Sequence, residues 1–316
     1  TTPLQHLGSY PVPAPDRASR RTTLRLVTDP GALRYGLHKV DGHRLLARDA
    51  PGGSRIVEAL GDIEQADHVA VLVPGNGHHL GNYFSEPGPV APRARGKLLL
   101  ATMRALSPRS RSAVVVWVGY HAPAGLAAAA SIAPARDGAA DLARLTYHLP
   151  RSAHITVVGH SYGSTVGGLA LTASRADDFV ALGSPGIGVR HREELGAGTH
   201  LWAAQARQDW IRFFPRTRIG RLGLGRSPLH PDLGAIRFGT GDIAGHFSYY
   251  DDGSESLRNV ARIAVGHYTS VTPAATSVVD DATTRQSSSS APVLAAALAA
   301  GELATADGRA VLHAFL

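Results

Sequence analysis

The sequence predicts an α/β protein built on a mostly parallel, doubly wound sheet with an antiparallel edge at its N-terminal side. Short apolar runs that end near glycine or proline recur along the chain, which is typical of parallel strands buried on both faces. Helical stretches long enough to act as crossovers lie between these runs. With 44% hydrophobic residues in 316, the chain also has enough apolar material for one large core.

The antiparallel edge is predicted by the first two strand candidates, residues 44–48 and 55–60, because Pro51-Gly52-Gly53 between them is a turn signal. Six later apolar runs are expected to form strands: 68–73, 113–118, 155–158, 179–182, 201–206 and 235–238. Helices are expected over about 93–106, 136–148, 164–173 and 255–265. Together these elements define a main domain over residues 43–268.

Two terminal segments differ in composition from this domain. Residues 1–42 begin with a proline-rich stretch of little periodicity, which predicts an extended arm. Residues 269–316 begin as a Ser/Thr/Ala-rich linker and are expected to end in a helix over about 292–303. No apolar run approaches the roughly 18 residues of a membrane span, and no signal sequence is visible. Localisation therefore stays open, with the cytoplasm as the default.

Composition excludes several kinds of chemistry. The chain has no cysteine, which rules out disulfides, Cys-ligated zinc, iron–sulfur clusters and a cysteine nucleophile. Its net charge of +7 could indicate a nucleic-acid partner, but the basic residues are nearly all arginine and are scattered along the chain. Such dispersion is more typical of high-GC coding than of a binding footprint, so no nucleic-acid partner is expected.

Two other patterns point weakly to a cofactor or a metal. Gly75 and Gly77 after the strand 68–73 resemble the start of a dinucleotide fingerprint, but Leu80 stands where the third glycine should fall. His78 and His79 are adjacent and therefore point in different directions, without the spacing that metal ligands need. We expect neither a cofactor nor a metal.

The segment Gly159-His160-Ser161-Tyr162-Gly163 matches the G-x-S-x-G elbow, which lifts a serine out of a tight strand-to-helix turn. The glycines are needed because the backbone is strained and crowded there. The motif alone is weak in a chain with 35 glycines. Its context strengthens it, since the apolar run 155–158 precedes it and a small-residue helix follows. Ser161 is the predicted nucleophile.

A serine nucleophile needs a base and a carboxylate that orients the base, and in this architecture the chain order is Ser, acid, His. Asp209 follows the strand 201–206 and so lies at that strand's C-terminal edge, which makes it the predicted acid. Asp178 is the alternative. It begins a strand instead of ending one, which favours a structural role.

Three histidines follow Asp209 and are candidates for the base: His230, His246 and His267. His246 is favoured because it lies just past the last strand candidate, where a loop can reach back over the sheet edge. The oxyanion of acyl transfer also needs two backbone N–H donors. One is expected from Tyr162, and the other from Asn76 or Gly77 in the loop after strand 68–73.

The chain resembles a family of actinobacterial-type α/β-hydrolases that has been catalogued as a domain of unknown function. The resemblance covers about 70% of the chain, roughly residues 43–267. It is carried by the GHSYGS elbow at 159–164, Trp117-Val118-Gly119-Tyr120, Gly183-Ser184-Pro185-Gly186 and Gly245-His246. It implies an α/β-hydrolase fold and the roles of nucleophile, acid and base for Ser161, Asp209 and His246. It implies no particular substrate.

The predicted function is hydrolysis of a small-molecule carboxylic ester or thioester through an acyl-serine intermediate. The alternative is a non-hydrolytic binding protein or cyclase that uses the same pocket. Residues 210–230 mix aromatic side chains with arginines, which fits either a lid over the pocket or a solvated loop. The sequence indicates no oligomeric state.

Overall fold

The computed structural model describes residues 31–85, 91–196, 198–213 and 223–275. Within these ranges the chain forms a nine-stranded sheet in the order β1-β2-β3-β5-β4-β6-β7-β8-β9. The strands are β1 (His38–Val40), β2 (His43–Arg48), β3 (Ile56–Leu60), β4 (His68–Val73), β5 (Ser112–Val118), β6 (His154–His160), β7 (Asp178–Leu182), β8 (His200–Ala204) and β9 (Ile236–Arg237). Pairing is antiparallel from β1 through β3 to β5 and parallel from there to β9. The predicted sheet, with its antiparallel N-terminal edge, is confirmed.

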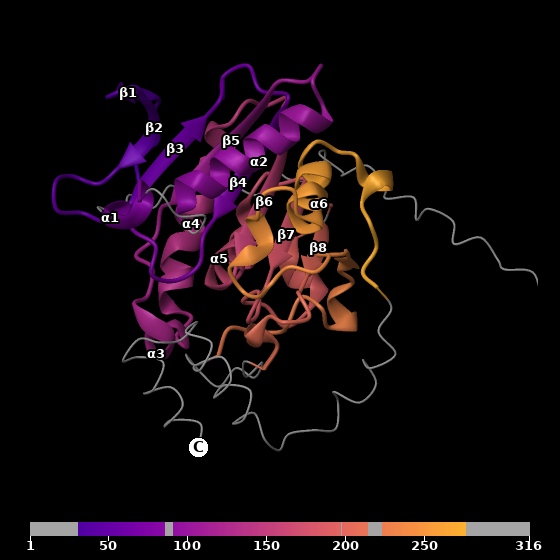
Figure 1. Cartoon of the computed structure of the whole chain (residues 1–316). Helices are drawn as coiled ribbons and strands as arrows, with labels where there is room; N and C mark the ends of the chain where they lie inside the picture. Colours follow the sequence, from indigo (N-terminus) through magenta and orange to yellow (C-terminus); the bar gives the residue numbers. More distant parts are fainter. Residues whose placement is uncertain (1–30, 86–90, 197, 214–222, 276–316) are drawn as a thin grey trace, which may run out of the picture.

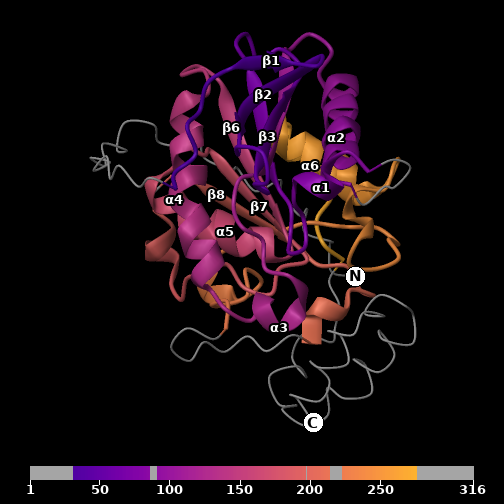
Figure 2. The same ribbon diagram turned by 90° about the vertical axis from the view of Figure 1, so that its left-hand side faces the viewer.

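Helices cover both faces of this sheet (Figures 1 and 2). They are α1 (Leu80–Tyr83), α2 (Pro92–Leu106), α3 (Gly125–Ala129), α4 (Ala133–His148), α5 (Tyr162–Ala170) and α6 (Glu255–Ala264). α2 and α6 pack on one face, and α4 and α5 pack on the other. Each face has its own apolar core.

The two cores explain why the central strands are apolar without interruption. In β4, Val69, Val71 and Val73 belong to the core beneath α4 and α5, whereas Ala70 and Leu72 belong to the core beneath α2 and α6. Successive strand side chains point to opposite faces, so most positions of a strand covered on both sides are apolar.

The described residues form short elements that the sequence pattern did not indicate, among them β1, α1 and α3. β1 lies inside the predicted arm and pairs with β2, and just before it the amide of Leu33 donates to the Asp141 carboxylate at 3.3 Å. Helices α1 and α3, of four and five residues, are too short to show a period. Residues 1–30 of the arm and the expected helix at 292–303 fall outside the described residues.

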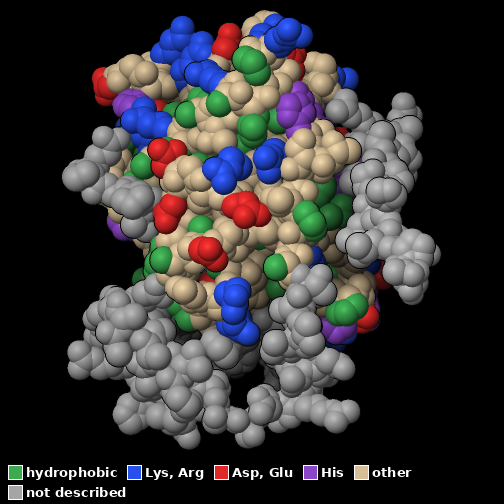
Figure 3. All heavy atoms as spheres, turned by 45° about the vertical axis from the view of Figure 1, so that its right-hand side comes forward, with side chains coloured by type: hydrophobic (Ala, Val, Ile, Leu, Met, Phe, Trp, Pro, Cys, Tyr) green, Lys and Arg blue, Asp and Glu red, His purple; other side chains and the backbone are tan. Residues whose placement is uncertain are grey.

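Parallel strands place their C-terminal ends along one edge, where sheets of this kind bind ligands. The segments that follow β4, β6, β8 and β9 therefore meet there, and they carry the candidate residues around positions 76, 161, 209 and 246. On the face shown in Figure 3, basic side chains are interspersed with acidic ones. No helix in the described ranges is long and apolar enough to cross a bilayer.

Candidate active site

Ser161 stands in the turn between β6 and α5, in a strained backbone conformation. Its φ of 53° and ψ of −130° are unusual for a residue with a side chain. The elbow is closed by glycines, since a Cβ on Gly159 would lie 2.5 Å from the Cα of Ser164, and one on Gly163 would collide with the carbonyl of Val73. This is the strand–turn–helix context that the motif requires.

Asp209, His246 and Ser161 form one hydrogen-bonded line. The Oγ of Ser161 lies 2.8 Å from Nε2 of His246, and Nδ1 of His246 lies 2.9 Å from Oδ1 of Asp209. Because an ionised carboxylate can only accept, Nδ1 carries the imidazole proton, which leaves Nε2 free to accept from the serine hydroxyl. All three side chains are buried, with exposed fractions of 5% for Ser161, 2% for His246 and 0% for Asp209. This arrangement can transfer a proton from the hydroxyl to the imidazole.

Tyr249 supports the carboxylate from the other side, a role that no sequence pattern indicates. Its hydroxyl donates to Oδ2 of Asp209 at 2.6 Å and accepts from the amide of Ala206 at 2.9 Å. The amide of Ile211 donates to Oδ1 of Asp209. Burial, followed by the Asp209 charge, raises the pKa of Tyr249 well above its ordinary value. The phenol therefore stays protonated and holds the carboxylate in place.

Replacing Asp209 with Asn is expected to lower kcat about ten-thousandfold while the fold is kept, because the amide would stabilise the wrong imidazole tautomer. Tyr249→Phe removes one hydrogen bond to the same carboxylate and should cost about 10- to 100-fold. Steady-state kinetics on both variants test this order of effects. A larger kinetic loss in Asp178→Asn than in Asp209→Asn would contradict it.

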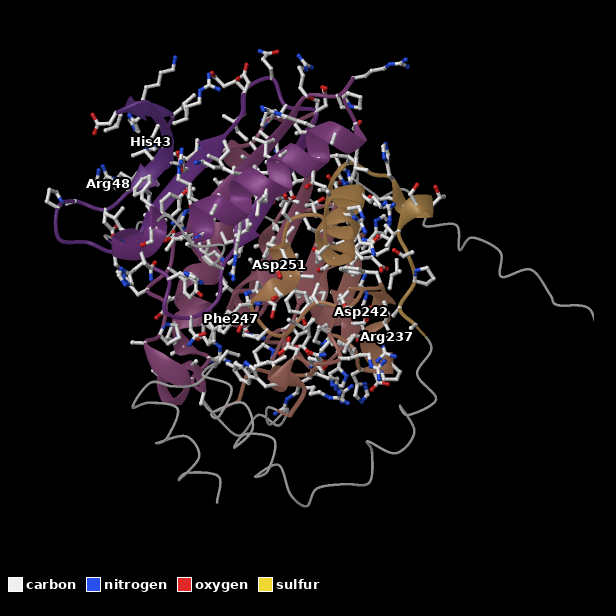
Figure 4. All side chains as sticks on the ribbon, viewed as in Figure 1. His43, Arg48, Arg237, Asp242, Phe247 and Asp251 are labelled. Carbon is white, nitrogen blue, oxygen red and sulfur yellow. The ribbon has the colours of Figure 1, made fainter. Side chains whose placement is uncertain are left out.

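His246 is held by its neighbours as well as by Asp209. His160, next to Ser161, donates from Nε2 to the main-chain carbonyl of His246 at 2.7 Å. Burial, followed by the His246 and Arg95 charges, lowers the pKa of His160 well below its ordinary value, so this ring is neutral. The rings of Trp210 and Phe247 lie 4.7 and 5.2 Å from that of His246. Phe247 is 41% exposed and is labelled in Figure 4.

The backbone N–H groups predicted to donate to an oxyanion differ in whether they already have a hydrogen-bond partner. Tyr162 is the first residue of α5, so its N–H has no partner within the helix. The amide of Gly77 donates to the carbonyl of Pro123 at 3.0 Å and is therefore not available. This corrects the prediction for Gly77, since a turn glycine can use its N–H to fix the turn itself. Asn76 remains, and its amide has no hydrogen-bond partner among the described residues.

The two other candidate bases, His230 and His267, contact residues outside the Ser161 site. Nδ1 of His230 accepts from the amide of Asp232 at 3.3 Å and caps the 3₁₀ turn Pro231–Leu233. His267 follows α6 and interacts with His68, which begins β4 at the opposite end of the sheet from Ser161. Neither histidine takes part in the hydrogen-bonded line described above.

Asp178 also lies at the opposite end of the sheet, where it begins β7. Its buried carboxylate accepts hydrogen bonds from four side chains: His154 at 2.6 Å, His200 at 3.1 Å, Trp202 at 2.8 Å and Tyr268 at 2.7 Å. Burial alone would raise the pKa of Asp178, but the hydrogen bonds from His154 and His200 outweigh it and lower this pKa. Asp178 therefore joins β7 to β6, β8 and the segment after α6.

Asp178→Asn is expected to reduce the free energy of unfolding at pH 7 by about 3 kcal/mol and to change kcat less than about tenfold. A pKa that is lower in the folded state stabilises the fold above the ordinary value of 3.8, and this contribution is lost as the pH falls through the lowered pKa. The difference from wild type should therefore shrink below about pH 4. Urea unfolding at both pH values measures it, and equal stabilities at pH 7 would refute the structural role.

His78 and His79 have separate structural surroundings and do not form a common site. Nδ1 of His79 caps α1 by accepting from the amide of Gly81, whereas burial lowers the pKa of His78 to about 3. Among the residues that the structure describes, no group of three or more His, Asp or Glu side chains is arranged to hold a metal ion. Residues 214–222, in the middle of the aromatic–basic segment 210–230, fall outside the described part.

Comparison with known proteins gives the family. A sequence profile described as alpha/beta hydrolase matches residues 49–219. Uncharacterized protein Rv2079 of Mycobacterium tuberculosis strain H37Rv is 30% identical over 255 residues, which cover 68% of this chain and 38% of that protein. Uncharacterized protein Mb0988c of Mycobacterium bovis is 33% identical over 180 residues, which cover 54% of this chain and 68% of that protein. The chain thus spans less than half the length of the first relative.

Solved structures resemble the chain at lower sequence identity. XC6422 from Xanthomonas campestris, described as an a/b serine hydrolase without lid, has a TM-score of 0.37 and 14% identity, and the match covers 73% of this chain and 97% of that one. An alpha-beta serine hydrolase homologue from Coxiella burnetii has a TM-score of 0.37 and 12% identity over 73% of this chain and 99% of that one. With its profile match over more than half its length, this chain belongs to the α/β-hydrolase family.

Proposed function

We propose that this hydrolase cleaves small-molecule carboxylic esters or thioesters through an acyl-serine intermediate on Ser161. The observation that carries the proposal is the line from Asp209 through His246 to Ser161, with bonds of 2.9 and 2.8 Å. A serine hydroxyl is a weak nucleophile at neutral pH, and this geometry is the one that activates it.

The reaction begins when Nε2 of His246 takes the hydroxyl proton as Oγ of Ser161 attacks the acyl carbon. Asp209 stabilises the imidazolium that forms. The amides of Tyr162 and Asn76 donate to the oxyanion of the tetrahedral intermediate. His246 then protonates the leaving alcohol or thiol, and water, activated by the same imidazole, releases the acid from the acyl-serine.

The surroundings of the base support an apolar substrate group. The Trp210 and Phe247 rings flank His246, and the exposed Phe247 ring offers an apolar surface beside it. Aromatic side chains of this kind bind acyl or aryl portions by contact area, while backbone donors orient the reacting carbonyl.

The test combines turnover with labelling. The wild-type protein is assayed on p-nitrophenyl esters of graded acyl length and on acyl thioesters, and a fluorophosphonate probe is applied in parallel. We expect turnover of at least one ester or thioester and labelling of Ser161. Labelling without hydrolysis of any member of the panel would favour the cyclase alternative, and the absence of both would favour a binding protein.

A further inference from the structure

We propose that Tyr120 is the positioning residue of the oxyanion site, because it holds the loop Pro74–Gly77 and the residue Tyr162 at the same time. This inference rests on the proposed function, since it concerns the donors to the oxyanion formed at Ser161. Tyr120 itself does not touch the reacting atoms. It acts through the two backbone segments that supply the N–H groups.

The first contact is made by the Tyr120 hydroxyl, which lies 2.9 Å from the carbonyl oxygens of both Pro74 and Gly75. The side chain is buried, and burial raises the pKa of Tyr120 well above its ordinary value. The phenol therefore keeps its proton and shares it between the two carbonyls, as a three-centre donor.

This bond fixes the direction of the loop's N–H groups. In a trans peptide the C=O and the N–H point in opposite directions. Because the carbonyls of Pro74 and Gly75 turn toward Tyr120, the amides of Gly75 and Asn76, which share those two peptide planes, point away from it. The loop also lies against the nucleophile, since a Cβ on Gly75 would be 2.9 Å from the Cβ of Ser161.

The rest of the loop is held as well, so Tyr120 acts on a segment that has little freedom to adjust. The Gly77 amide donates to the carbonyl of Pro123, and the Gly77 carbonyl accepts from Nδ2 of Asn82 at 2.8 Å. Of the two donors predicted for this loop, Asn76 is the one whose amide is not used in fixing it.

The second contact is made by the Tyr120 ring. It stacks on the ring of Tyr162, with centroids 6.1 Å apart and planes 13° apart. The Tyr162 hydroxyl donates to the carbonyl of Ser131 at 2.6 Å, which ties this residue to the segment before α4. The backbone N–H of Tyr162 is the other proposed donor. Tyr120 thus contacts both halves of the oxyanion site, and catalysis by fixed donors depends on their being in place before charge develops.

The experiment compares Tyr120→Phe with Tyr35→Phe. Phe at position 120 keeps the ring and its stacking and removes only the hydroxyl. Tyr35 is the matched control: its hydroxyl also donates to a backbone carbonyl, that of Asp141 at 2.9 Å, and it accepts from Trp117, whose ring also stacks on that of Tyr120. Both variants lose the same chemical group, but Tyr35 does not contact the loop that carries Asn76.

Two readouts are measured: kcat and KM on p-nitrophenyl butyrate, and the rate constant for fluorophosphonate labelling. The labelling time course is normalised to its end point, so the rate constant does not depend on the fraction of molecules that are folded. For Tyr120→Phe we expect kcat and the labelling rate constant to fall together by about 10- to 100-fold with KM little changed. For Tyr35→Phe we expect both to stay within about threefold of wild type.

A labelling rate constant for Tyr120→Phe within about threefold of wild type would overturn the inference. An equal loss in Tyr35→Phe would also overturn it, because the effect would then be one of general packing. Failure of the proposed function is a separate result. A wild-type protein that labels but hydrolyses no ester contradicts hydrolysis, and the labelling rate constants still decide the role of Tyr120.

Discussion

Ser161→Ala is expected to abolish ester turnover and fluorophosphonate labelling together. Both reactions form a covalent bond to Oγ, so the variant lacks the atom that reacts. Removing a serine of this kind costs about a millionfold in kcat. Alanine keeps the Cβ that the elbow already accommodates at a φ of 53°, so the fold should be retained. Intact-mass spectrometry after labelling, together with kcat on p-nitrophenyl butyrate, measures the result.

Ser174→Ala is the control for this variant. The Ser174 hydroxyl is buried and donates to the carbonyl of Leu171, beyond the far end of α5, so its loss should leave labelling stoichiometric. Labelling that persists in Ser161→Ala would place the nucleophile elsewhere and would refute the assignment of the elbow. Loss of labelling in Ser174→Ala as well would point to a general loss of structure.

The fold could be predicted because its central strands are buried on both faces. In runs such as Val69–Val73, successive side chains alternate between the two cores, so the sequence shows a continuous run of apolar residues. β1 could not be predicted in this way. Its three residues are all exposed, and it is specified by its pairing with β2, which no local pattern records.

The candidate site could be predicted in part, because chain order and strand ends constrain it. Asp209 and Asp178 were separable from sequence, since one follows a strand and the other begins one, and the structure places them at opposite ends of the sheet. The partners that hold the site were not separable. Tyr249 contacts Asp209 across 40 residues of chain, and Tyr120 contacts Gly75 across 45, and tyrosines in such places carry no distinguishing spacing.

The sequence could not decide whether Gly77 donates its N–H to an oxyanion or to the turn. A glycine with positive φ after a strand is equally suited to donate to an oxyanion and to close a turn, and its φ of 74° is compatible with both. The direction of a single N–H decides between these uses, and here it is directed at Pro123. Backbone hydrogen bonds of this kind depend on tertiary packing, so they are settled only when neighbouring loops are in place.

His246→Ala is expected to lower kcat by about a millionfold, an effect as large as that of losing the nucleophile, because serine and histidine act as one unit. In the wild-type protein, Nε2 of His246 lies 2.8 Å from Oγ of Ser161 and can accept its proton. Without the imidazole, this acceptor is lost. Asp209 would also lose the Nδ1 donor that its buried carboxylate accepts from. Single-turnover labelling and kcat should therefore both fall, while thermal unfolding stays cooperative.

The other two histidines are the matched controls for this prediction, since all three followed Asp209 in the sequence as candidate bases. His230→Ala removes a cap from a surface turn, and His267→Ala changes the segment after α6, so each should cost less than about tenfold in kcat. The prediction fails if His246→Ala keeps wild-type turnover while either control loses it. That outcome would mean that a histidine outside the observed hydrogen-bonded line accepts the proton, and that the line serves only to stabilise the fold.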